Sequence, residues 1–212
     1  MSKYKCVIFD CDGVLVDSEI IANTVMVDMA NELGANLTLD YAIKTFKGAS
    51  MQFCMDHIAH RIPQRLPNDF LPRFRQRSFE AFEKNIQPIE GVAEVLENLQ
   101  MPFCVASSGP ENKIRLNLEL TGLLPHFEDN IFSCFTIRKW KPDPAVFLWA
   151  AETMGFKPEE CVVIEDSISG VNAAKNGGFD VFGFTKHDVN NELEGNATLT
   201  FNDMSEVLEL IH

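Results

Sequence analysis

From residue 91 onward, the chain alternates short apolar runs with segments of helical periodicity. Runs typical of buried strands occur at 103–106, 131–134, 161–164 and 179–184. Helices are expected at 91–100, 111–121, 144–155 and 168–177, and a weaker strand at 198–201 precedes a final helix. Because strands and helices alternate, the sequence predicts an α/β fold with a parallel sheet covered by helices on both faces.

The first apolar run, Val7-Ile8-Phe9, ends directly in two aspartates one residue apart, Asp10 and Asp12. A continuous β-branched and aromatic run is typical of a strand that is buried on both faces. The loops at the carboxyl ends of parallel strands line the crevice where α/β sheets bind ligands. The two carboxylates are therefore candidate site residues, although an Asp-x-Asp-Gly sequence also suits a plain capped turn.

Residues 18 to about 87 contain no run typical of a buried strand. The apolar spacing instead predicts helices at 18–33, after Asp40, from about Ser50 and at 68–84. Since the opening strand precedes this block and the alternating units follow it, we expect a helical domain, residues 16–88. It would be inserted into a core domain made of residues 1–15 and 89–212.

Composition limits the kinds of partner. Lys and Arg number 18 against 31 Asp and Glu, a formal net charge of -13, which disfavours nucleic-acid and membrane partners. An anionic metabolite would have to be held locally by a metal ion, a few lysines and backbone N–H groups. The chain opens with a strand instead of a secretory signal and lacks an apolar run of membrane-spanning length, so a cytoplasmic location is expected. The six scattered cysteines, without a CxxC pair, are expected to be buried free thiols.

Polar side chains also follow the later strands. The segments at these points are Ser107-Ser108-Gly109, Lys141 before a proline, and Glu165-Asp166. Each has an ordinary structural interpretation, respectively a turn, a solvated lysine and the N-cap of the next helix. Since the carboxyl ends of parallel strands meet at one edge of a sheet, these segments are also expected to gather around the two aspartates. Their coincidence favours a site for phosphoryl chemistry.

Phosphoryl transfer gives the acidic residues distinct roles. Asp10 could attack phosphorus to form an aspartyl-phosphate, and Asp12 could protonate the leaving alkoxide and then activate water. Mg²⁺ would relieve the repulsion between such adjacent anions, because it takes carboxylates, waters and phosphate oxygens as ligands. The expected metal-binding residues are Asp10, Asp12, Asp166 and Glu165, the last directly or through water.

The remaining groups would bind the phosphate. A hydroxyl and backbone N–H groups at the start of a helix suit phosphate oxygens. The expected phosphate-binding residues are Ser107, Ser108, Gly109, Asn112 and Lys113. A fixed ammonium at Lys141, held by the stiff Lys-Pro-Asp-Pro loop, could neutralise both the nucleophile and the phosphate.

The sequence resembles the haloacid dehalogenase superfamily over essentially its whole length. Four motifs in order carry the resemblance: Asp10-Cys11-Asp12-Gly13-Val14, Ser107, Lys141 in Lys-Pro-Asp-Pro, and Glu165-Asp166. The resemblance implies a Rossmann-like three-layer core with a small helical cap inserted after the first strand, Mg²⁺ dependence, a nucleophilic Asp10 and an acid/base Asp12. True dehalogenases lack the second aspartate and the metal site, so carbon–halogen chemistry is disfavoured.

Residues 12–19 and Lys47-Gly48-Ala49-Ser50 resemble the β-phosphoglucomutase-type branch, which contains both phosphatases and mutases. Its mutases carry a histidine early in the first cap helix and an arginine soon after the Lys-Gly pair. Here residues 20–23 and 50–52 contain neither, and this absence favours hydrolysis. Residues 108–113 and 138–144, with Trp140 before the lysine, further resemble bacterial 6-phosphogluconate phosphatases.

The leading hypothesis is a Mg²⁺-dependent phosphatase that hydrolyses a small sugar phosphate or sugar-acid phosphate, similar to 6-phosphogluconate, through an aspartyl-phosphate. A phosphohexomutase of the β-phosphoglucomutase type is an alternative. A catalytically silent phosphate-binding protein is an alternative from another class. The cap is expected to select the leaving group, with Lys47 as a candidate contact. We expect a monomer and leave a dimer open.

Overall fold

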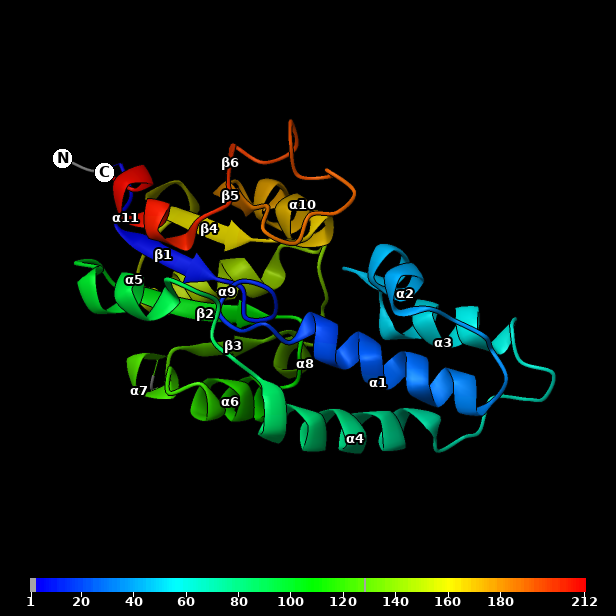
Figure 1. Ribbon diagram of the computed structural model, residues 1–212. Helices are drawn as coiled ribbons and strands as arrows, with labels where there is room; N and C mark the ends of the chain where they lie inside the picture. The colour runs from blue at the N-terminus through cyan, green and yellow to red at the C-terminus, as the bar shows by residue number, and fades with distance from the viewer. Residues whose placement is uncertain (1–2, 128) are drawn as a thin grey trace. The chain divides into compact units, whose positions relative to one another are not determined.

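The computed structural model describes residues 3–127 and 129–212 and confirms the α/β fold. These residues form a parallel sheet of six strands in the order β3-β2-β1-β4-β5-β6 (Figure 1). The strands are β1 (Cys6–Phe9), β2 (Phe103–Ser107), β3 (Ile131–Ser133), β4 (Cys161–Glu165), β5 (Asp180–Phe184) and β6 (Leu199–Phe201). Because β1 lies between β2 and β4, its carboxyl end is next to theirs.

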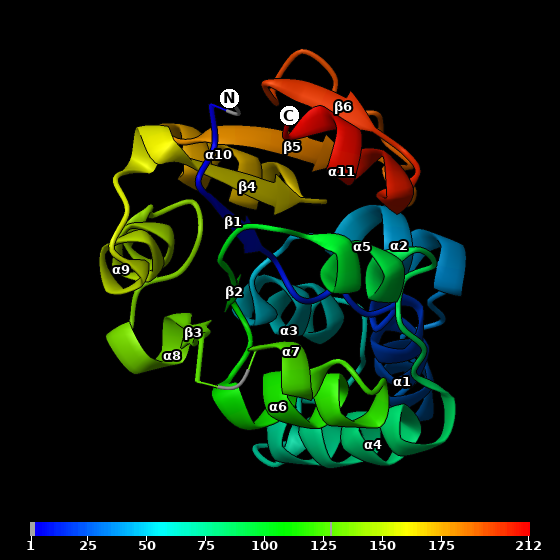
Figure 2. The same cartoon turned by 90° about the vertical axis from the view of Figure 1, so that its left-hand side faces the viewer.

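Helices cover both faces of the sheet, as Figure 2 shows. On one face lie α9 (Ala145–Met154) and α10 (Ile168–Asn176). On the other lie α5 (Val92–Asn98), α6 (Glu111–Leu120), α7 (Leu124–Phe127) and α11 (Val207–Leu210). The three-layer arrangement expected from the alternation of strands and helices is therefore confirmed.

Burial on both faces explains why the strands are apolar without alternation. Ile8 of β1 belongs to the same buried cluster as Val146 of α9 and Val171 of α10. On the opposite face, the ring of Phe9 packs edge-on against Phe103, whose ring also packs against Phe127 of α7. A polar residue at any of these strand positions would lose its contact with water, which accounts for the continuous apolar runs.

The chain divides into two compact units, one made of the residues up to Asp17 together with Gln87–His212, the other of Ser18–Ile86. The second unit contains the four predicted helices, which are α1 (Glu19–Glu32), α2 (Leu39–Phe46), α3 (Met51–Ala59) and α4 (Phe70–Asn85). It has its own buried core, in which Met26, Ile58 and Phe74 take part. The roles of the two units as catalytic core and cap stay a prediction.

One predicted boundary is wrong in a way that affects the site. The strand expected over 131–134 ends at Ser133, and Cys134 begins the short helix α8 (Cys134–Ile137). The Ser133 hydroxyl accepts a hydrogen bond from the N–H of Phe135 at 3.1 Å and so caps the new helix. Sequence periodicity gives no sign of this change, because Cys134 is a buried residue like Ile131 and Phe132 of the strand before it.

All six cysteines are buried and free, as predicted. No helix in the described part of the chain is long and apolar enough to cross a membrane.

The packing of α9 gives a stability prediction from two adjacent residues. Phe147 is fully buried and its ring packs against that of Phe179, whereas Leu148 is 39% exposed. Phe147→Ala should lower the free energy of unfolding by about 3–5 kcal/mol, because it leaves a cavity in the core. Leu148→Ala should change it by less than about 0.5 kcal/mol. Urea denaturation of both variants tests this, and similar losses in the two would contradict the packing described.

Candidate active site

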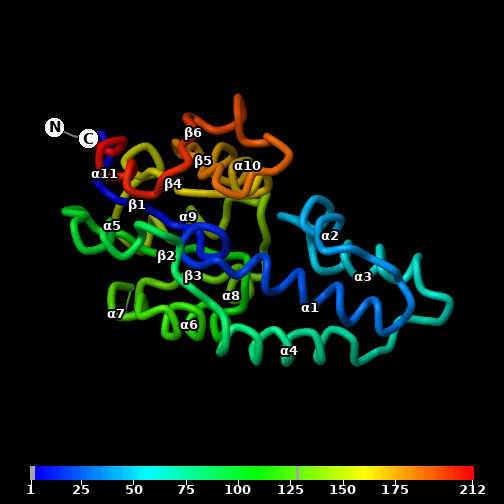
Figure 3. The backbone as a smooth tube through the Cα atoms, viewed as in Figure 1, coloured from blue at the N-terminus to red at the C-terminus, as the bar shows by residue number. Residues whose placement is uncertain are grey.

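The segment that follows β1 is a tight turn anchored to the neighbouring strand. The N–H of Asp10 donates to the carbonyl oxygen of Ile164 in β4 at 2.9 Å. The chain then reverses direction, which Figure 3 shows as the blue loop between β1 and α1. Within this loop, the N–H groups of Leu15 and Val16 both donate to the carbonyl oxygen of Cys11. This turn fixes the direction in which the two aspartates leave the strand.

Gly13 in this turn is required for two reasons. Its φ of +79° lies in the left-handed region that favours glycine. A Cβ at this position would also lie 2.7 Å from Cγ of Asp166, closer than carbon atoms can approach. Glycine therefore allows the loop after β1 to contact the acidic residue that follows β4.

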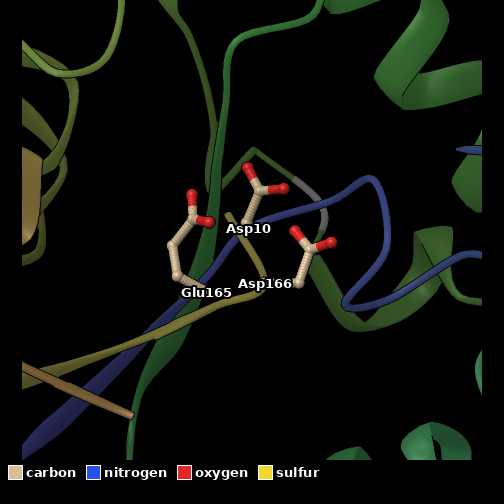
Figure 4. Close-up of side chains that lie close together, drawn as sticks. All are labelled: Asp10, Glu165 and Asp166. Atoms are coloured by element: carbon tan, nitrogen blue, oxygen red, sulfur yellow. The ribbon is translucent and has the colours of Figure 1, made fainter. Parts of the chain in front are cut away.

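Three buried carboxylates converge between β1 and β4. Asp10, Glu165 and Asp166 each offer one oxygen, and these oxygens all lie within 4.8 Å of one another (Figure 4). Asp10 follows the end of β1, and the other two lie at the end of β4. The sequence placed these residues at strand ends, and the parallel pairing of the two strands brings them together.

Lys141 lies against two of these carboxylates. Its Nζ is 2.6 Å from Oδ1 of Asp10 and 2.5 Å from Oε1 of Glu165, and it also donates to the carbonyl oxygen of Ala106 at 3.2 Å. Only 3% of its side chain is exposed, and the ammonium lies 4.7 Å from the centre of the Phe147 ring. The ammonium is thus held between β1, β2 and β4, in contrast to the solvated lysine that its loop position also allowed.

The charges of this cluster depend on one another. Burial raises the pKa of the Asp10 carboxyl well above its usual range; Lys141 opposes this shift, and the carboxylate of Glu165 adds to it. Burial alone would lower the pKa of Lys141, but Asp10 and Glu165 outweigh burial and raise the lysine pKa above its ordinary value. Lys141 therefore remains positively charged, and a further cation near the carboxylates would favour the ionised form of Asp10.

Glu165 connects the cluster to the following helix. Its Oε2 accepts hydrogen bonds from the N–H and the hydroxyl of Ser167 at 3.0 and 2.9 Å, while Oε1 contacts Lys141. A Cβ on Gly170 of α10 would collide with this carboxylate. Both oxygens of Glu165 are therefore engaged by the protein, which makes it a poorer direct metal ligand than Asp10 or Asp166.

The segment expected to bind phosphate is held by its neighbours. The hydroxyl of Ser107, a residue 1% exposed, accepts from the N–H of Gly109 at 3.0 Å. Ser133 Oγ donates to the carbonyl oxygen of Gly109 at 2.6 Å, and Cys134 Sγ lies 3.9 Å from Oγ of Ser108. Ser133 was not among the site residues predicted from the sequence. The parallel register pairs Ser133 with Ser107, so the strand pairing, had it been known, would have indicated that Ser133 lies beside this segment.

The other predicted residues lie in different surroundings. Lys113, expected to bind phosphate, has its Nζ 2.7 Å from both carboxylate oxygens of Asp12. The Asp12 carboxylate thus contacts α6 and is not part of the three-carboxylate cluster. Asn112 is exposed in the first turn of α6, and Lys47 follows α2 in the other compact unit.

The donor set fits a hard divalent cation. All the candidate ligands of the cluster are carboxylate oxygens, which Mg²⁺ and Ca²⁺ prefer. When every group is ionised, Asp12 and the three carboxylates of the cluster carry four negative charges. Lys113 and Lys141 offset two of these charges, so two formal negative charges remain. One divalent cation would balance this remainder.

Comparison with known proteins gives matches over most or nearly all of the chain. The family model described as haloacid dehalogenase-like hydrolase matches residues 4–178. A 6-phosphogluconate phosphatase of Escherichia coli (strain K12) is 33% identical over 211 residues, which cover 99% of this chain and 96% of that protein. The resemblances found in the sequence are thereby confirmed.

Solved structures show the same architecture. A haloacid dehalogenase-like protein from Agrobacterium tumefaciens superimposes with a TM-score of 0.88 at 28% identity, covering 98% of this chain and 97% of its own. A haloacid dehalogenase family hydrolase from Deinococcus radiodurans, solved with bound phosphate and sodium, superimposes with a TM-score of 0.80 at 29% identity. The match covers 98% of this chain and 94% of that protein. These matches extend over both compact units.

The close approach of Gly170 to Glu165 can be tested by a pair of substitutions. Alanine is favoured over glycine in a helix by about 1 kcal/mol, yet its Cβ would overlap the Glu165 carboxylate. Gly170→Ala should therefore lower the free energy of unfolding, by about 1–3 kcal/mol. In a Glu165→Ala background the same change should be neutral or stabilising. Chemical denaturation measures both effects, and stabilisation by Gly170→Ala in the wild-type background would show that the two residues do not compete for space.

Proposed function

Because the chain belongs to the haloacid dehalogenase-like hydrolase family, we propose that it is a Mg²⁺-dependent phosphatase that hydrolyses a small sugar phosphate or sugar-acid phosphate through a phosphorylated Asp10. Its class as a phosphoric monoester hydrolase follows from the family and from its phosphatase relatives. The observation that carries the proposal is the ammonium of Lys141, buried between Asp10 and Glu165.

In the first step, an oxygen of Asp10 attacks the phosphorus atom. A bond forms between this oxygen and phosphorus, the bond to the leaving oxygen breaks, and Asp12, which enters the step protonated, gives its proton to the leaving alkoxide. Lys141 supports this step, since a buried ammonium beside the nucleophile offsets the repulsion between a carboxylate and an incoming phosphate. The hydroxyl of Ser107 and the N–H groups after it would bind the phosphate oxygens.

In the second step, water displaces Asp10 from phosphorus. Asp12, now ionised, takes a proton from the water as the new oxygen–phosphorus bond forms and the bond to Asp10 breaks. Inorganic phosphate leaves, and both aspartates return to their starting states. Asp12 lies outside the buried cluster, and its side chain is 25% exposed. This supports its role as the acid/base, because the group that exchanges protons must reach both the alkoxide and the water.

Asp10 and Asp166 would bind the metal directly, and Glu165 would bind it through water. Asp12 would lie near the metal. When bound, Mg²⁺ supplies positive charge to the phosphate oxygens and keeps the nucleophile ionised. The oxygen-only donor set and the charge remaining in the site support this assignment.

The substrate class rests on two observations. A full-length relative is named 6-phosphogluconate phosphatase, and residues 108–113 and 138–144 resemble that group. The helical unit 18–86 would act as the cap, and Lys47 in it would contact the leaving group. The missing mutase histidine and arginine favour hydrolysis over phosphoryl transfer between sugars.

Phosphate release from a panel of sugar phosphates, sugar-acid phosphates and nucleotides tests the proposal. With Mg²⁺, the wild-type protein should release phosphate fastest from small sugar or sugar-acid phosphates, and a chelator should abolish release until Mg²⁺ is restored. Asp10→Asn should abolish turnover because it removes the nucleophile. Asp40→Asn is a matched control, since Asp40 is an exposed aspartate whose only described salt bridge is with Lys44 on the surface.

Three outcomes would contradict the proposal. A wild-type protein inert toward the whole panel would exclude the phosphatase. Conversion of glucose 1-phosphate to glucose 6-phosphate without net release of phosphate would establish the mutase. Ligand-dependent stabilisation without hydrolysis, unchanged by Asp10→Asn, would identify a binding protein.

A further inference from the structure

We propose that Lys113 is a positioning residue that holds the carboxylate of Asp12 at the place where the leaving group is protonated. The inference rests on the proposed phosphatase function. It assigns to Lys113 a role that differs from the phosphate binding expected from its sequence position.

The contact is a two-point ion pair. Lys113 Nζ lies 2.7 Å from Oδ1 and 2.7 Å from Oδ2 of Asp12, so one ammonium contacts both oxygens of the carboxylate. The side chains are 21% and 25% exposed, whereas the side chains of Lys141 and Asp10 are 3% and 10% exposed. The Asp12 pair is therefore the more accessible of the two lysine–aspartate pairs, as an acid/base that meets substrate and water must be.

The lysine keeps Asp12 apart from the other acids. Asp10, Glu165 and Asp166 form a tight group that attracts cations, and Asp12 is only two residues from Asp10 along the chain. The two lysines pair with different carboxylates, Lys141 with Asp10 and Glu165, and Lys113 with Asp12.

The base of Lys113 is rigid. It lies in α6, whose first turn includes a hydrogen bond from the N–H of Lys113 to the carbonyl oxygen of Pro110 at 3.0 Å. A Cβ on Gly109 would lie 3.7 Å from Cδ of Lys113 and 3.7 Å from Oδ2 of Asp12, so the ion pair rests against this glycine. Since Ser107 and Ser133 fix Gly109, the phosphate-binding segment and the acid/base residue are aligned by the same contacts.

The two roles for Lys113 predict different kinetics. A phosphate-binding lysine would affect every phosphate monoester, and its loss would raise both KM and the inhibition constant of inorganic phosphate. A residue that acts through Asp12 would mainly affect kcat, and most strongly for substrates whose leaving alkoxide needs a proton. The effect should shrink for p-nitrophenyl phosphate, whose leaving group departs without one.

A double-mutant cycle of Lys113→Met and Asp12→Asn tests the proposal. Asp12→Asn should lower kcat for an alkyl phosphate by roughly 10²–10⁴-fold. Lys113→Met should lower it by roughly 10–100-fold with little change in KM, as is typical of residues that orient a reacting group. Added to Asp12→Asn, Lys113→Met should have no further effect, because its partner is already altered. Lys113→Arg should restore part of kcat, since arginine can also contact both oxygens.

Arg115→Met is the matched control. It removes a positive charge two residues along the same helix, where the described ion pair is with Glu111 on the surface, and kcat should be unchanged. Two results would overturn the proposal. One is a loss of kcat in the double variant equal to the product of the losses in the two single variants. The other is a rise in KM with unchanged kcat in Lys113→Met.

A crystal structure of Lys113→Met separates this inference from the proposed function. The Asp12 carboxylate should leave its place in the variant, whether or not the wild-type protein hydrolyses any substrate. An unmoved Asp12 would overturn the positioning role even if the phosphatase is established. An inactive wild-type protein would reject the phosphatase while the position of Asp12 still decides what Lys113 does.

Discussion

The buried ammonium of Lys141 between Asp10 and Glu165 is the interaction on which the arrangement of the site depends. It joins the ends of β1 and β4, and through the carbonyl oxygen of Ala106 it also reaches β2. Buried ion pairs contribute little to stability compared with well-packed apolar side chains, while loss of one partner costs about 3–5 kcal/mol. A chemical role accounts for such a lysine better than a structural one.

The order of the sheet makes this interaction possible. β1 lies between β2 and β4, so Asp10 is flanked on one side by the segment after β2, which we propose to bind phosphate, and on the other side by the acidic pair. Glycine is required where these segments meet, at Gly13 against Asp166 and at Gly170 against Glu165. Backbone and carboxylates therefore approach one another more closely than any other residue type at these two positions would allow.

Much of this could be predicted from the sequence, because the determining signals are local. The apolar run at residues 7–9 predicts a strand buried on both faces, and the polar residues that follow several of the strands predict the candidate site. The role of Ser133 depends on strand register, and the partner of Lys113 depends on which way a long side chain points from α6. Neither is encoded in a local pattern, and the resemblance to a family did not supply them.

The central claim is that the phosphoryl group is first transferred to Asp10, forming an aspartyl-phosphate, and is then released by water. The most direct test is to mix the protein with substrate and Mg²⁺, quench with acid during turnover, and analyse the peptides by mass spectrometry. The account predicts that the peptide containing Asp10 gains the mass of one phosphoryl group, and that Asp10→Asn does not. Steady release of phosphate by the wild-type protein, with a quench fast enough to trap acyl phosphates and no phosphorylated peptide, would contradict it.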